Sequence, residues 1–220
     1  MRALIFDLDG TLVDTVYAHV FAWQRALAEA GMAIEGWRIH RRIGMDGGLL
    51  TRSLIAELGR QISVPEANAI QQRHGELFAQ LLPERWPLLG AVDLLKFLRS
   101  IGVPFGIATS GQRPEINSSL QALGIPQETV VIERGDVRRA KPEPDLFLAC
   151  QQRLAVSLEE CYVVGDAVWD ILAARRAGML AIGLLTGGYG GDELTRAGAF
   201  RVYRDPAELH RSLYELGFSP

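Results

Sequence analysis

Two aspartates separated by a single residue follow the first apolar segment of the chain. Residues 3–8 are apolar apart from Asp7, and Asp9 is followed by Gly10. Successive side chains of a strand alternate between its two faces, so Asp7 and Asp9 are expected to point to the same side. Neighbouring carboxylates repel each other, and a hard cation with oxygen ligands, such as Mg2+, removes that repulsion. The pair therefore predicts a metal site at the end of a buried strand, with a turn containing two aspartates as the alternative.

A second pair of acids follows another apolar segment much later in the chain. Residues 161–165 lead into Asp166 and, four positions further on, Asp170. If a helix begins just after Asp166, both carboxylates face the space beyond the strand. A helix cap with a favourable acid in the first turn is the alternative. Together the two pairs favour a metal site, because parallel sheets bind ligands at the carboxyl ends of their strands.

Two further polar segments lie between these pairs. Residues 105–108 end in Thr109, Ser110 and Gly111, which offer hydroxyl and backbone N–H donors to an anion. A turn of these residues without a ligand is the alternative.

Lysine occurs at only two positions, Lys96 and Lys141, and arginine supplies the other strongly basic side chains. The compact ammonium group of lysine fits between a carboxylate and a phosphoryl oxygen as a point charge, unlike a planar guanidinium group. We therefore predict that Lys141 belongs to the site. A solvated basic turn that includes Arg138 and Arg139 is the alternative.

The elements that position these residues follow from hydrophobic periodicity. Apolar runs alternate with amphipathic helical patterns, which predicts an α/β fold with a mainly parallel sheet covered on both sides. These runs occupy residues 3–8, 103–109, 129–133, 161–165, 179–185 and 200–203. Residues 15–85 show only helical periodicity, including an apolar stripe of Val16, Val20, Trp23 and Leu27. We therefore predict a core domain of residues 1–14 and 86–220 and an inserted helical cap domain of residues 15–85.

Composition limits the classes of partner. The 220 residues carry a formal net charge of −3, so no general basic field is available and a nucleic acid partner is not expected. No apolar stretch approaches the roughly 20 residues of a membrane helix. The two cysteines, Cys150 and Cys161, have no metal-like spacing and are expected to be free buried thiols. A cytoplasmic protein is the expectation.

Four motifs in order along the chain resemble those of the haloacid dehalogenase superfamily. They are Asp-x-Asp-Gly-Thr at 7–11, Thr-Ser at 109–110, Lys-Pro at 141–142 and Gly-Asp-x-x-x-Asp at 165–170. The chain is most similar to the phosphatase branch with a helical cap, the group that contains phosphoglycolate phosphatase and beta-phosphoglucomutase. The resemblance spans nearly the whole chain and implies a Rossmann-like three-layer core with a small inserted α-helical cap.

The resemblance also implies roles for the acidic residues. Asp7 would be the nucleophile that forms an aspartyl-phosphate, and Asp9 would carry protons to the leaving oxygen and from the attacking water. Mg2+ would be held by Asp7, the backbone carbonyl of Asp9 and Asp166, with Asp170 in an outer position or bridging through water.

Substrate contacts are assigned by the same resemblance. Thr109 and the Ser110 amide would hold the transferring oxygens, and Lys141 would offset the charge on Asp7 and the phosphoryl group. One departure is Ala167, where many members of the superfamily have serine. Further substrate-binding candidates are Gly111 in the core and, in the cap, Thr15, His19 and Arg42, although a packing or surface role for the last two is the alternative.

The function that follows is a Mg2+-dependent phosphatase acting on a small phosphorylated metabolite, as a monomer or homodimer. A phosphosugar mutase on the same scaffold is the main alternative, but the cap shows no clear lysine and arginine pair for a second phosphate. A 2-haloacid dehalogenase is a weaker alternative because its chemistry needs neither Asp9 nor a metal. A phosphate-binding module without catalysis would have no use for four mutually repelling carboxylates.

Overall fold

A computed structural model describes residues 2–218, and the chain divides into two compact units. The first, called here the α/β unit, comprises Met1–Asp14 and Arg85–Pro220, and the second, the helical unit, comprises Thr15–Glu84. The expected division placed residue 85 with the helical segment, whereas the structure places Arg85 in the α/β unit.

The α/β unit contains a parallel six-stranded sheet in the order β3-β2-β1-β4-β5-β6. The predicted α/β class with a mainly parallel sheet is therefore confirmed. Each strand lies within one of the predicted apolar runs, because strands covered on both faces are continuously apolar. The strands are β1 (Ala3–Phe6), β2 (Phe105–Ala108), β3 (Val130–Ile132), β4 (Cys161–Gly165), β5 (Leu180–Leu184) and β6 (Arg201–Tyr203).

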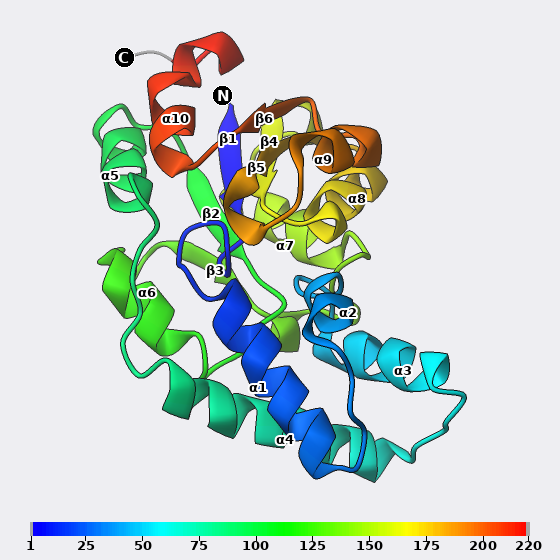
Figure 1. The fold of residues 1–220 in the computed structure, drawn as a ribbon. Coiled ribbons are helices and arrows are strands. Elements are labelled where there is room, and N and C mark those ends of the chain that lie inside the picture. Colours follow the sequence, from blue (N-terminus) through cyan, green and yellow to red (C-terminus); the bar gives the residue numbers. More distant parts are fainter. Residues whose placement is uncertain (1, 219–220) are drawn as a thin grey trace. The chain divides into compact units, whose positions relative to one another are not determined.

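Helices connect these strands and cover the sheet (Figure 1). The α-helices of this unit are α5 (Ala91–Ser100), α6 (Asn117–Leu123), α7 (Asp145–Leu154), α8 (Val168–Ala177), α9 (Gly191–Ala197) and α10 (Pro206–Arg211). Short 3-10 helices span Arg134–Asp136, Leu158–Glu160, Leu185–Gly187 and Leu213–Leu216. Among residues 2–218, none of the helices combines the length and apolar character that crossing a bilayer requires.

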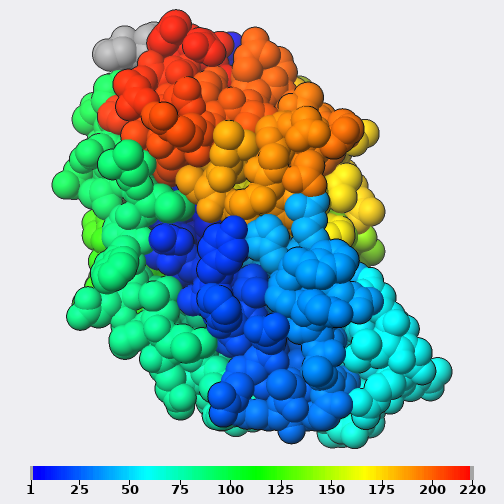
Figure 2. Space-filling view, in the orientation of Figure 1, coloured from blue at the N-terminus to red at the C-terminus, as the bar shows by residue number. Residues whose placement is uncertain are grey.

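Alternating side chains of β1 enter two separate apolar cores. Leu4 and Phe6 pack with residues of α5, α6 and α10, whereas Ala3 and Ile5 pack with residues of α7, α8 and α9. Figure 2 shows atoms of α10 (red) lying directly against those of α5 (green). Both helices contribute residues to the first core. The result is three layers, with the sheet between two layers of helices. The carboxyl end of β1 is thus held between two packed cores.

The helical unit has its own apolar core, contributed by all four of its helices. They are α1 (Val16–Glu29), α2 (Gly36–His40), α3 (Gly47–Glu57) and α4 (Val64–Leu81). Local sequence fixes the start of α4, where Ser63 and Glu66 form a reciprocal capping box. Asp46 caps α3 by accepting a hydrogen bond of 3.0 Å from the Leu49 N–H.

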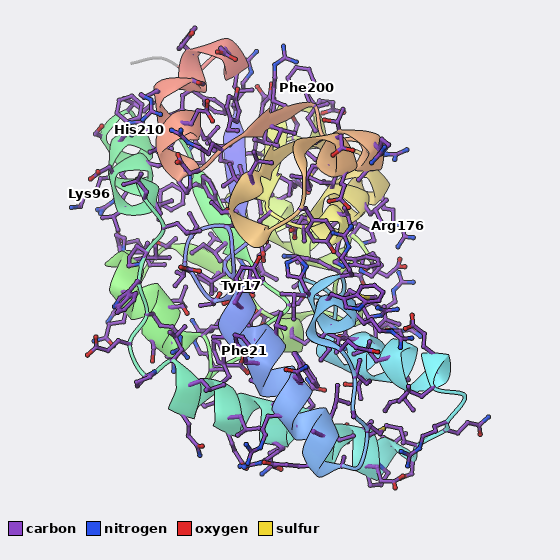
Figure 3. The ribbon with its side chains drawn as sticks, in the orientation of Figure 1. Tyr17, Phe21, Lys96, Arg176, Phe200 and His210 are labelled. Atoms are coloured by element: carbon purple, nitrogen blue, oxygen red, sulfur yellow. The ribbon has the colours of Figure 1, made fainter. Side chains whose placement is uncertain are left out.

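Helix α1 has one buried and one exposed side. The predicted stripe of Val16, Val20, Trp23 and Leu27 is buried. Tyr17 and Phe21 are one helical turn apart on α1 (Figure 3) and are 55% and 59% exposed.

Two histidines pair inside the helical unit. The Nδ1 atom of His19 on α1 lies 3.0 Å from the Nε2 atom of His74 on α4, and both side chains are buried. The His74 ring stacks on Trp23 with centroids 4.1 Å apart, and the His19 ring stacks on Phe78 at 3.8 Å. Burial, reinforced by His19, lowers the pKa of His74 well below its usual value.

This pair predicts a loss of stability in mild acid. The unfolded chain protonates His74 near pH 6.5, whereas the folded chain keeps it neutral, so the free energy of unfolding falls as pH decreases below 6.5. The expected loss is about 1.4 kcal/mol per pH unit for one such group. Urea unfolding of His74→Gln between pH 7.5 and 5.5 should show a shallower pH dependence than the wild type. His210→Gln, in the α/β unit, serves as the control, and an unchanged slope in His74→Gln would refute the prediction.

Candidate active site

The predicted acids meet at the carboxyl ends of two neighbouring strands. Asp7 directly follows β1 and Asp166 directly follows β4, and the Asp7 N–H donates to the Val164 carbonyl at 2.9 Å. Parallel pairing of Phe6 with Val164 brings the two strand ends to the same level. The chain order of the sheet reverses between β1 and β4, which is where open α/β sheets bind ligands.

Three carboxylates and one ammonium group form a buried cluster there. Asp7, Asp166 and Asp170 each place a carboxylate oxygen within 4.8 Å of the others. Lys141 Nζ contacts Asp7 and lies 2.8 Å from Asp170 Oδ1, and the Lys141 side chain is 0% exposed. The predicted association of these four residues is thus seen in the structure.

Electrostatics within the cluster reflect its burial. Burial raises the pKa of Asp7 to about 7, with Lys141 opposing and Asp170 reinforcing the shift. Burial also raises the pKa of Asp166 well above its usual value, helped by the charges of Asp170 and Asp7. Burial disfavours the charged form of Lys141, but Asp170 and Asp7 outweigh that effect and raise its pKa. The raised pKa values of Asp7 and Asp166 show that the cluster, with a single ammonium group, disfavours the ionised forms of these two carboxyl groups.

A divalent cation would remove this penalty. With all three carboxylates ionised, the cluster would carry two negative charges after the Lys141 ammonium group is counted, and a dication would balance them. Carboxylate oxygens are the ligands that Mg2+ prefers. Asp7 and Asp166, with Asp170 beside them, are the described side chains that could hold it.

Asp170 takes the helix-capping position that was considered for it and also contacts Lys141, a pairing that the sequence analysis did not propose. Its Oδ2 accepts a hydrogen bond of 3.0 Å from the Ala167 N–H at the start of α8, while its Oδ1 faces Lys141. An acid near a helix N-terminus satisfies backbone donors and the helix dipole. The hydrogen bond from the Ala167 N–H therefore fixes the orientation of the Asp170 carboxylate, which contacts Lys141.

Two glycines allow the backbone to approach these carboxylates closely. A Cβ atom on Gly165 would lie 2.3 Å from Asp170 Cβ, and one on Gly187 would lie 1.8 Å from Asp166 Oδ2. Any side chain at either position would displace a carboxylate of the cluster. The glycine-rich segment after β5 thus packs against Asp166, a contact that its sequence alone did not indicate.

Thr11 is a site residue to which the sequence analysis assigned no role. Its hydroxyl donates to Asp166 Oδ1 at 2.6 Å and is buried. The Thr186 hydroxyl similarly donates to the Gly10 carbonyl at 2.5 Å. The threonine that ends the first motif was the available signal, since a buried hydroxyl needs a hydrogen-bond partner.

The turn after β2 is held by hydrogen bonds to the end of β3 and by the Thr109 side chain. The Thr109 N–H donates to the Ile132 carbonyl at 3.0 Å, and the Gly111 N–H donates to Thr109 Oγ1 at 3.0 Å. The Gly111 carbonyl accepts from the Arg134 N–H at 2.9 Å. Thr109 is buried and Ser110 is half-buried at the same edge of the sheet as Asp7. The turn is thereby anchored to the end of β3.

The candidates from the predicted cap lie in the helical unit. Thr15 precedes α1, and His19 belongs to the histidine pair described above. Arg42 contacts Glu57 and donates to Ser53 Oγ at 3.0 Å. Its charge is therefore balanced by an acid within its own unit.

Comparison with known proteins decides the family. A family model described as haloacid dehalogenase-like hydrolase matches residues 1–178. The chain belongs to this hydrolase family. A solved hydrolase from Pseudomonas syringae is 43% identical with a TM-score of 0.95, covering 98% of this chain and 99% of that one.

Two of the curated relatives of this hydrolase illustrate different named activities. Phosphoglycolate phosphatase of Rhodospirillum rubrum is 30% identical over 218 residues, covering 94% of this chain and 89% of the relative. Beta-phosphoglucomutase of Bacillus subtilis is 29% identical over 217 residues, covering 95% and 92%. Both similarities extend across the two units, and the resemblance inferred from the four motifs is confirmed.

Proposed function

We propose that this hydrolase is a Mg2+-dependent phosphatase that cleaves a small-molecule phosphomonoester through an aspartyl-phosphate at Asp7. The buried cluster of Asp7, Lys141, Asp166 and Asp170 is the observation that carries the proposal. A buried carboxylate beside an ammonium group and a cation site suits attack on a phosphoryl group, whose own negative charge must be offset. Several phosphatases among the curated relatives support the same reaction class.

The first step transfers the phosphoryl group to the enzyme. A carboxylate oxygen of Asp7 attacks phosphorus in line, and the bond between phosphorus and the ester oxygen breaks. The Asp9 carboxyl group donates its proton to the departing alkoxide, which leaves as an alcohol. Thr109 and the Ser110 N–H donate to the transferring oxygens, and Lys141 offsets the negative charge between Asp7 and the phosphoryl group.

The second step returns the enzyme to its starting state. Asp9, now a carboxylate, takes a proton from water, and the oxygen of that water attacks phosphorus. The bond between phosphorus and Asp7 breaks, which releases inorganic phosphate and regenerates both the Asp7 carboxylate and protonated Asp9. Both roles of Asp9 require its carboxyl group to lie within hydrogen-bond reach of the oxygens around the phosphoryl group held at Asp7.

Mg2+ would be held by Asp7, the Asp9 carbonyl and Asp166, with Asp170 outside or bridging through water. When bound, it supplies positive charge against the phosphoryl oxygens. Thr11 and Gly187 keep the Asp166 carboxylate in position for that role.

We further propose that the helical unit is the cap that selects the substrate. Thr15, His19 and Arg42 remain its candidate substrate contacts. A small phosphorylated metabolite as partner, a cytoplasmic location and a monomeric or homodimeric state also stay predictions.

Phosphate release in the presence and absence of metal tests this function. The purified protein should hydrolyse p-nitrophenyl phosphate with Mg2+, lose activity with EDTA and recover it when Mg2+ is restored in excess. A panel of phosphorylated metabolites would then identify the substrate class from the largest kcat/KM. Absence of phosphate release from every ester in Mg2+ would overturn the proposal, and activity unaffected by EDTA would overturn the role of the metal.

A phosphosugar mutase is the second candidate, favoured by the beta-phosphoglucomutase relative. A mutase interconverts hexose 1- and 6-phosphates and releases little inorganic phosphate. Measuring both products in one reaction separates the two functions, and we expect phosphate release to dominate.

A further inference from the structure

Arg85 is a buried arginine that none of the four motifs contains. It begins the second segment of the α/β unit, and its side chain is 8% exposed. Burying a guanidinium group costs free energy unless acidic groups compensate it, and arginine remains charged inside proteins. The acidic groups near Arg85 therefore indicate the role of its guanidinium group.

Backbone contacts place the Arg85 segment beside the loop that follows β1. The Asp14 N–H donates to the Trp86 carbonyl at 3.0 Å, and the Leu88 N–H donates to the Leu12 carbonyl at 2.9 Å. Val13 forms bridges with both Pro87 and Asp9. The residues after Arg85 are thus tied to the same short loop that carries Asp9.

The Asp9 carboxylate also lies next to a second loop, which carries Glu115. A Cβ atom on Gly111 would lie 3.8 Å from Asp9 Oδ2 and 2.7 Å from Ile116 Cγ2, so all three residues are close neighbours. Asp9 and Glu115 both interact electrostatically with Arg85. Burial lowers the pKa of Arg85, and these two carboxylates oppose that shift. Two acids from two different loops therefore lie within electrostatic range of one guanidinium group.

We propose that Arg85 is a positioning residue that holds the Asp9 carboxyl group toward the leaving oxygen, with Glu115 as a second acid that fixes the guanidinium group. This inference rests on the proposed function. A carboxyl group at a loop can adopt several rotamers, and a neighbouring cation held by a second acid restricts that choice. Because Glu115 shares the charge of Arg85, the guanidinium group is suited to orienting Asp9 rather than to binding an additional anion of the substrate.

The inference predicts an effect that depends on the leaving group. An alkoxide must receive a proton as it departs, whereas p-nitrophenolate is stable without one, so only alkyl esters depend strongly on a well-placed Asp9. A structural role of Arg85, or a role in holding the phosphoryl group, would affect both esters equally. The ratio of kcat/KM between the two esters therefore isolates the positioning role, because kcat/KM reports the step in which the leaving group departs.

The experiment compares Arg85→Met, Arg85→Lys and the exposed-site control Arg99→Met, each checked for folding by circular dichroism. With an alkyl phosphate, kcat/KM of Arg85→Met should fall by about 100-fold, the lower end of the contribution of a general acid. With p-nitrophenyl phosphate it should fall by less than about 5-fold, since little protonation is needed. Arg85→Lys keeps the charge without the planar fork and should lie between, so it tests the inference even if Arg85→Met does not fold. Arg99→Met should match the wild type on both esters.

A double-mutant cycle supplies the second test. If Arg85 acts through Asp9, then Arg85→Met should cause little further loss in an Asp9→Ala background. Additive losses, or equal losses on both esters from an active wild type, would overturn this inference alone. A wild type that hydrolyses neither ester would instead overturn the proposed function, and the positioning role with it.

Discussion

Replacing Asp7 with asparagine is expected to abolish phosphatase turnover while leaving the protein folded. Asparagine has nearly the same shape but lacks the nucleophilic oxygen, so kcat should fall by at least about 10⁴-fold, as for other covalent catalysts that lose their nucleophile. Phosphate release from p-nitrophenyl phosphate in Mg2+ provides the measurement.

A folding measurement on Asp7→Asn separates a loss of catalysis from a loss of structure. Asp7 is buried with two other carboxylates, so removing its charge relieves repulsion from Asp170 at the same time as it removes a partner of Lys141. Asp93→Asn, an exposed acid on α5, is the matched control and should retain full activity. If Asp7→Asn retained more than about a tenth of the wild-type kcat, a nucleophilic role for Asp7 would be excluded.

Replacing Lys141 with methionine should cost both activity and stability. Methionine fills a similar volume but leaves the buried Asp7 and Asp170 carboxylates without their cation. Breaking a buried ion pair from one side typically costs about 3–5 kcal/mol in free energy of unfolding. Urea unfolding at pH 8 measures this cost, and Lys96→Met, which changes the exposed lysine labelled in Figure 3, is the control.

The sign of the pH dependence distinguishes this explanation from a simple packing defect. Without Lys141, the folded state favours protonated carboxyl groups in the cluster, so it binds protons that the unfolded state does not. The stability of Lys141→Met should therefore recover in part as pH falls from 8 to 5, whereas its activity should not return. A variant as stable as the wild type at pH 8, or one whose deficit is independent of pH, would contradict the proposed electrostatic role.

The sheet was predictable from sequence because its strands are buried on both faces. Such strands are continuous apolar runs, and the first acid of each pair directly follows one of them. Because parallel strands end at the same edge of a sheet, Asp7 and Asp166 were expected to lie together there. The helical segment was predictable for a similar reason, since the buried stripe of α1 has a clear helical period.

The contacts that complete the site were not predictable because they join residues far apart in the chain. Thr11 bonds to an acid 155 positions away, and Gly187 approaches the same carboxylate from the segment after β5. For His19 the sequence left both a substrate contact and a packing role open, and it did not indicate the pairing with His74 inside the helical unit. Periodicity specifies which face of a helix is buried, but not which partner it meets there.

Arg85 could not be identified from local sequence at all. It lies outside every motif, in a segment between two helices where an arginine would ordinarily be solvated. Contacts between distant parts of the chain, including the bridges from Val13 to Asp9 and Pro87, show that this segment lies beside the loop carrying Asp9.

Trapping the covalent intermediate tests the central claim most directly. The enzyme is mixed with substrate in Mg2+, quenched in acid and treated with borohydride, which reduces an aspartyl-phosphate to homoserine with release of phosphate. Peptide mass spectrometry should then find homoserine at position 7 after turnover with Mg2+, and unmodified aspartate there when EDTA is present. Homoserine at a different acid, or unmodified Asp7 in an enzyme that is turning over, would contradict the account.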